Sequence, residues 1–86
     1  MRAPGSNSPR TLENYLLDLV ALILEDAREA KRERDAAKKK SDRDFHDGRL
    51  AAYREVISLM QNQAAAFGIS LDSIGLNKID PEKELV

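Results

Sequence analysis

Four carboxylates on one short stretch come nearest to a catalytic pattern in this 86-residue chain. Glu25, Asp26, Glu29 and Glu33 share part of one helical face, because residues three or four positions apart lie side by side on a helix. Carboxylates that converge from several helices hold Mg²⁺ in metal-dependent enzymes. Here four cations are interleaved with them: Arg28, Lys31, Arg32 and Arg34. The second helix would add mainly Glu55, so we interpret the stretch as a solvated face and keep a metal-dependent enzyme as a distant third alternative.

A basic segment follows, and its side chains are of the type that contacts phosphates. It contains Lys38, Lys39, Lys40 and Arg43. Acidic neighbours reduce its local charge, the formal net charge of the chain is only −1, and a nucleic-acid-binding domain is usually strongly basic. Lysines at the end of a helix also offset its dipole. A nucleic-acid-associated role for this segment is therefore the second alternative, not the favoured one.

Nucleophilic and thiolate chemistry has little support in the sequence. The chain has no Cys and one His, which excludes thiolate zinc sites, thiol catalysis and disulfides. His46 has no neighbouring nucleophile with which to form a catalytic pair, and we expect it to be packed or hydrogen-bonded. We predict a non-enzymatic protein with no catalytic residues, no bound metal and no cofactor.

The length allows one domain. A domain this small buries only about 60% of the surface of its unfolded chain, and small chains compensate with disulfides, metals or partners. With the first two disfavoured, we expect partnership with another chain. Residues 1–8 resemble a disordered lead-in, and the apolar run from Tyr15 to Leu24 is shorter than the roughly 20 residues of a membrane span. We expect no membrane contact and a cytoplasmic location.

The pattern predicts an all-α, coiled-coil-like antiparallel hairpin at 9–68, with helices at about 9–40 and 42–67. Ser8-Pro9 is a helix-start signal. One apolar stripe, interrupted once by Arg34, then follows steps of four and three, as in coiled coils: Leu16, Val20, Ile23, Ala27, Ala30, Arg34 and Ala37. A second stripe follows in a different phase: His46, Leu50, Tyr53, Ile57, Met60, Ala64 and Phe67. The change of phase favours two helices over one long helix, and we expect Leu50, Tyr53, Ile57, Met60 and Phe67 to pack the hairpin.

Local signals predict the turns. Cations precede Ser41 and carboxylates follow it, as at a junction of two helices, and Ser41 with Asp44 resembles a capping box. Gly48 suggests a close approach of the first helix. The stop at Phe67-Gly68-Ile69 begins a C-terminal tail, 69–86, with a short helical turn, whose apolar side chains we expect to lie across the open end of the hairpin.

The first half of the first helix is apolar on all sides between Leu12 and Leu24. Such a helix must be covered on more than one side, which one partner helix cannot do. We therefore expect two copies to pair into a four-helix bundle. The predicted interface residues are Leu12, Leu16, Leu19, Val20, Leu22 and Ile23.

The run from Phe45 to Met60, F-H-D-G-R-L-A-A-Y-R-E-V-I-S-L-M, resembles F-x-x-G-R-L-x-A-Y-x-E-V-I-S segments of small, uncharacterised bacterial helical proteins. The resemblance covers under half of the chain. It implies a bacterial origin and a helical hairpin, and no activity or functional residue comes with it. We predict a structural or regulatory protein that acts through helix-mediated homo-oligomerisation and protein–protein contacts.

Overall fold

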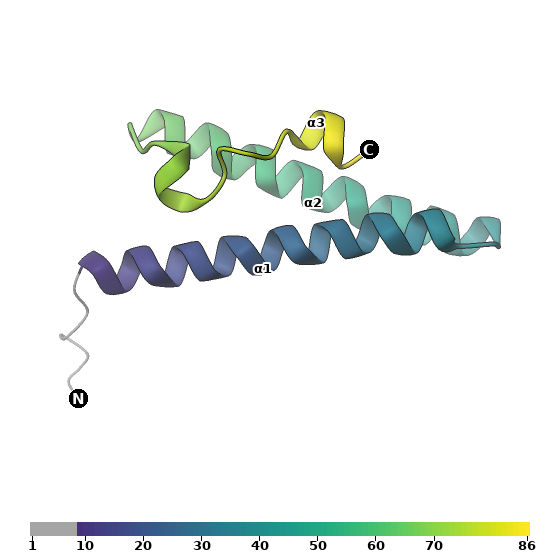
Figure 1. Cartoon of the computed structure of the whole chain (residues 1–86). Coiled ribbons are helices and arrows are strands. Elements are labelled where there is room, and N and C mark those ends of the chain that lie inside the picture. The colour runs from purple at the N-terminus through teal and green to yellow at the C-terminus, as the bar shows by residue number, and fades with distance from the viewer. Residues whose placement is uncertain (1–8) are drawn as a thin grey trace.

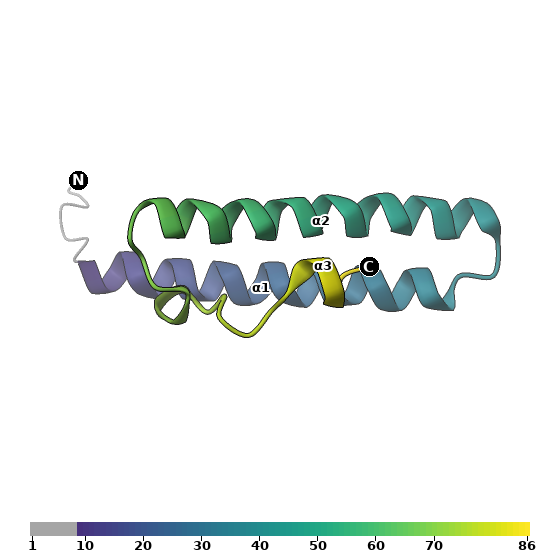
Figure 2. The same ribbon diagram turned by 90° about the horizontal axis from the view of Figure 1, so that it is seen from above.

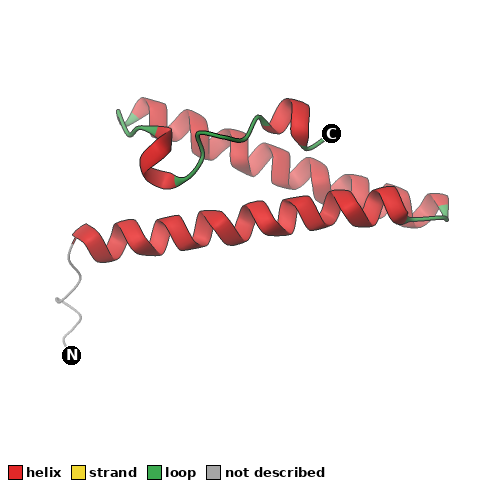
Figure 3. Ribbon diagram, in the orientation of Figure 1, coloured by secondary structure: helices red, strands yellow, loops and turns green. Residues whose placement is uncertain are grey.

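Two long antiparallel helices make up most of the molecule, for which a computed structural model describes residues 9–86 (Figures 1 and 3). They are α1, Pro9–Ala36, and α2, Lys40–Ala66. A 3₁₀ turn η2, Leu71–Ile74, and a short helix α3, Pro81–Glu84, follow. No strand occurs within residues 9–86. The predicted all-α hairpin with a short C-terminal helical tail is confirmed, while Ser8 and the lead-in at 1–8 lie outside the described residues.

The core of the hairpin is formed by the two predicted stripes. Its fully buried side chains are Val20, Ala27, Ala30, Leu50, Ile57 and Ala64. Tyr53 and Met60 are half-buried against this core. Phe67 was expected to pack here too, but 71% of its surface is exposed. The reason is its position: Phe67 caps the C-terminus of α2, at the rim of the hairpin.

The turn between the helices lies earlier in the chain than predicted. It needs only residues 37–39, so that α1 ends four residues before the expected position and α2 begins at Lys40. Arg34 on α1 donates to Asp47 on α2 at 3.0 Å, which ties the end of one helix to the start of the next. The prediction that Ser41 caps α2 is wrong, because Lys39 occupies the cap position and no side chain caps it.

Two glycines differ in what they contribute. Gly68 adopts φ 70°, and the Ile69 N–H donates to the carbonyl oxygen of Ala64 at 2.8 Å, so the predicted helix stop is formed as a Schellman-type turn. Gly48 lies exposed on α2, with no atom within 4 Å of where a Cβ would stand. The predicted close approach of α1 at Gly48 is therefore wrong.

The tail takes a path that the sequence did not predict. It runs back along one face of the hairpin, over the groove between α1 and α2, instead of across the open end (Figures 1 and 2). Its apolar side chains are buried there: Ile74, Leu76, Ile79, Pro81 and Leu85. The buried tail residues are spread over twelve positions of an extended segment. The long groove can bury all of them, whereas the end of a two-helix hairpin is too small to do so.

Polar side chains of the hairpin hold the end of the tail through its backbone. Lys31 donates to the carbonyl oxygen of Glu84 at 2.9 Å, Arg54 to that of Leu85 at 2.7 Å, and Arg34 to that of Val86 at 3.0 Å. Gln61 donates to the carbonyl oxygens of Leu76 and Ile79 at 3.2 and 2.9 Å. These donors form hydrogen bonds with backbone carbonyl groups of the tail that have no partner in a sheet or a long helix. The tail is thus a fixed third layer of the fold.

Leu85→Ala tests the contribution of this layer. Leu85 is 1% exposed, and truncation of a buried Leu costs about 2–4 kcal/mol through lost burial and a cavity. We expect the urea unfolding midpoint to fall markedly. Val86→Ala is the matched control, because Val86 is exposed and keeps its carbonyl; we expect a change within about 0.5 kcal/mol. Equal midpoints for the two variants would show that the tail does not stabilise the hairpin.

Candidate functional site

The face of the hairpin opposite the tail carries a large apolar surface. No part of residues 9–86 crosses this side, whereas the tail covers the other (Figures 1 and 2). Leu12, Tyr15, Leu59 and Phe67 are each at least 60% exposed. We call this surface the open face, and it comprises Leu12, Tyr15, Leu16, Leu19, Leu22 and Ile23 of α1, Val56, Leu59, Met60 and Phe67 of α2, and Ile69.

Helical spacing places these residues on one side of each helix. On α1 the exposed members follow steps of three and four from Leu12 to Leu22, the period of a single helical face. On α2, Val56, Leu59, Met60 and Phe67 are three, one and seven positions apart, which places them on one broad side of that helix. Helical periodicity places Arg54 and Gln61 on the side of α2 opposite Val56. These two residues hold the tail. The open face and the tail beyond η2 therefore lie on opposite sides of the hairpin, while Ile69 and Ile74, at the start of the tail, border the open face.

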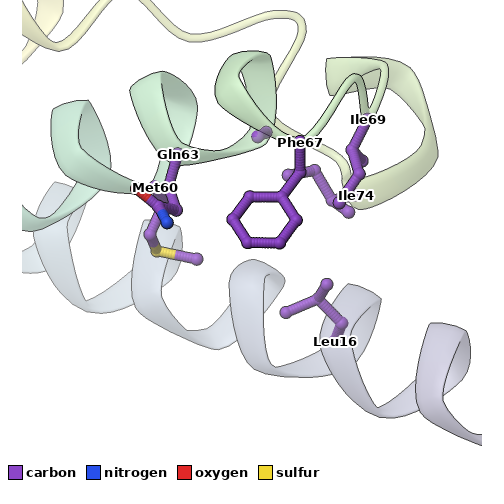
Figure 4. Close-up of a pocket in the computed structure, with 7 residues that line it drawn as sticks. Leu16, Met60, Gln63, Phe67, Ile69 and Ile74 are labelled. Carbon is purple, nitrogen blue, oxygen red and sulfur yellow. The ribbon is translucent and has the colours of Figure 1, made fainter.

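The open face has two shallow hollows in the groove between α1 and α2. One is about 360 Å³ and is lined by Leu16, Met60, Gln63, Ala64, Phe67, Ile69 and Ile74. Figure 4 shows the Phe67 ring reaching from α2 toward Leu16 of α1 beside this hollow. The other is about 310 Å³ and is lined by Ile23, Arg49, Ala52, Tyr53 and Val56. With one polar side chain in each, these hollows are suited to apolar side chains and present no catalytic arrangement.

The predicted interface residues divide into three groups. Leu12 and Leu22 are exposed on the open face, and Leu16, Leu19 and Ile23 are half-buried at it. Val20 is wrong as an interface residue, because it is 1% exposed. The tail covers its side of α1: a Cβ on Gly75 would stand 3.9 Å from Val20.

Sequence reasoning missed the share of α2 in this surface. Val56 and Leu59 were not among the predicted interface residues, and Phe67 was assigned to the core. All three are exposed. The available signal was their spacing, which makes a second apolar stripe on α2, one that neither α1 nor the tail covers.

Two of the four carboxylates on the acidic face of α1, Glu29 and Glu33, form ion pairs. Arg32 pairs with Glu29, and Arg49 of α2 donates to Glu33 at 2.5 Å. The hydrogen bond from Arg49 holds the pKa of Glu33 below its usual value, and the same bond raises the pKa of Arg49. Arg49 also lies 2.9 Å from His46 Nδ1. Within residues 9–86, no group of three or more His, Cys, Asp or Glu side chains is arranged to hold a metal ion.

The basic segment forms the exposed tip of the hairpin. Lys38 and Lys39 lie in the turn, and Lys40 and Arg43 in the first turn of α2, all exposed. Lys40 pairs with Asp44 at 2.8 Å, and this bond raises the pKa of Lys40. The four cations thus lie together in space, with one of them neutralised by a neighbour.

Comparisons with known proteins give no relative: no protein-family model matches the chain, and neither does any curated protein or solved structure. The resemblance of residues 45–60 to bacterial helical segments stays a prediction. Neither α1 nor α2 is long and apolar enough to cross a membrane, and the same holds for the other helices within 9–86.

Arg49→Gln tests the ion pair that borders the open face. Loss of the guanidinium should raise the pKa of Glu33 toward its usual value, as followed by carboxyl-carbon NMR during an acid titration. The lowered pKa in the folded chain means that Glu33 contributes stability above its unfolded-state pKa, which is lost as the pH falls through the folded-state pKa. Lys38→Gln, which removes an exposed cation that does not act on Glu33, is the control. An unchanged titration of Glu33 in Arg49→Gln would show that the pair does not form in solution.

Proposed function

We propose that this chain is a non-enzymatic structural or regulatory module that works by helix-mediated pairing with a second copy, through the open face. The observation that carries the proposal is the size of this face. Taking about 200 Å² for a fully exposed large apolar side chain, the seven most exposed members present roughly 800 Å². They are Leu12, Tyr15, Leu22, Val56, Leu59, Phe67 and Ile69.

This area matches what a stable interface needs. Each partner in a specific complex contributes about 800 Å², and the largest apolar patch on a typical monomer is roughly 300–600 Å². The tail of the chain is already bound on the opposite face. Residues 1–8 contain one large apolar side chain, Met1, and so offer too little apolar surface to cover the open face. A second copy supplies a surface of matching size and chemistry, as closed twofold dimers do.

Leu22→Glu together with Leu59→Glu tests the pairing. Both side chains are at least half exposed, so the hairpin should still fold, while four charges would be introduced into a dimer interface. We expect light scattering after size-exclusion chromatography to give a dimer mass for the unaltered chain and a monomer mass for the double variant, with the helical circular dichroism of the folded chain retained.

The matched control is Asn77→Glu, which adds a charge to the exposed tail on the other side of the hairpin. It should remain dimeric. A monomer mass for the unaltered chain at a concentration of about 100 µM, well above the Kd expected of an interface this large, would contradict the proposal. So would a double variant that stays dimeric.

A second candidate is a nucleic-acid-associated role, favoured by one observation: the cations of the tip are exposed and lie together. Lys38, Lys39 and Lys40 replaced jointly by Gln should then abolish binding that weakens steeply with salt. Fluorescence anisotropy with labelled duplex DNA and single-stranded RNA at low salt measures it. No binding by the unaltered chain under these conditions removes this candidate.

A further inference from the structure

The stripe that α1 contributes to the open face changes character halfway along the helix. Leu12, Tyr15, Leu19 and Leu22 are followed, at the same steps of four and three, by Asp26, Glu29 and Glu33. The stripe on α2 changes at the matching level, since Val56 and Leu59 give way to Ala52 and Arg49. The α1 part of the open face is therefore apolar only in the half that lies near the start of α1, while on α2 the exposed Phe45 follows Arg49 at the same spacing.

The position of this change decides which arrangements of two copies, placed open face to open face, are favourable. If they overlap along their full length and point the same way, three acidic residues of each α1 enter the interface beside the other copy's α2. Arg49 is the only cation of α2 on that stripe, and it is already paired with Glu33. Carboxylates taken out of water without partners are costly. Overlap along the full length in opposite directions is worse, since it places Asp26 and Glu29 against the other copy's leucines.

The remaining arrangement buries no carboxylate. Two hairpins that point in opposite directions and overlap only between residues 12 and 24 of each α1 place apolar side chains against apolar side chains. The same shift brings the Phe67 end of each α2 over the Val56 region of the other. Asp26, Glu29 and Glu33 then project beyond the overlap and stay in water.

From this placement we infer that the chain forms an antiparallel, offset dimer, with the apolar halves of the two open faces overlapping and the charged tips at opposite ends. The inference rests on the proposed function and specifies the partner's orientation. The twofold axis passes near the level of residue 18. Since an α-helix rises 1.5 Å per residue, each tip lies about 30 Å from the axis and the two tips about 60 Å apart. Both tails face outward, so the pair is a two-ended spacer that presents two identical basic tips.

A single spin label measures this geometry directly. The chain has no Cys, so Ser41→Cys gives one label at each tip, on an exposed residue. Pulsed electron–electron double resonance on the full chain should give a distance centred near 60 Å. The same label in the Leu22→Glu, Leu59→Glu background is the control and should show no dipolar modulation.

Other results overturn the inference in distinguishable ways. A distance below about 35 Å means that the two copies overlap along their full length and point the same way. A distance near 40 Å means that they overlap along their full length and point in opposite directions. Both limits use the helical rise of 1.5 Å per residue. Either contradicts the offset arrangement and leaves the proposed pairing intact. No modulation in the unaltered background, together with a monomer mass by light scattering, overturns the pairing itself and the inference with it.

Discussion

The structure depends on one constraint: apolar side chains cover most of the circumference of the first half of α1 and must be shielded from water in several directions. A second helix covers one side of a helix and leaves the rest exposed. Two other parts of the same chain, α2 and the tail, each cover one side of α1. First, α2 buries Ala27 and Ala30 and half of the surface of Ile23, and then the tail returns to cover Val20. The third side of α1 is left as the open face, which is the surface that the proposed second copy would cover.

The tail shows how a short extended segment can be part of a stable fold. Its apolar anchors at Leu76, Ile79 and Leu85 are separated by stretches that form no long helix, so their backbone groups need partners. Long donors from both helices provide them, among them Lys31 and Arg54. Because these side chains belong to the otherwise charged half of the hairpin, part of the basic content of the chain has a structural role, independent of any ligand.

The two long helices and the stop at Gly68 were predictable, since each follows from local rules, whereas the end of α1 was predicted four residues too late. The coiled-coil spacing gave both helices, and Gly68 and Pro81 act at the positions where a left-handed stop and a first helical residue are favoured. The path of the tail was not predictable, because it depends on non-local burial and on hydrogen bonds such as that from Gln61 to Ile79. That path also decided the candidate site: it removed Val20 from the exposed surface. The exposure of Phe67 depends on where the rim of the hairpin falls, which periodicity alone does not give. The function stays a proposal drawn from one surface, since no residue pattern here specifies chemistry.

The central claim is that a second copy covers the open face, and isotope-filtered NMR tests it most directly. In a mixture of ¹³C-labelled and unlabelled chains, the filter selects contacts between protons of different copies. The account predicts intermolecular contacts at the methyl groups of Leu22 and Leu59, and none at those of Leu76 and Leu85, which are tail residues buried against the hairpin within one copy. Intermolecular contacts at Leu76 or Leu85, or none at Leu22 and Leu59, would contradict it.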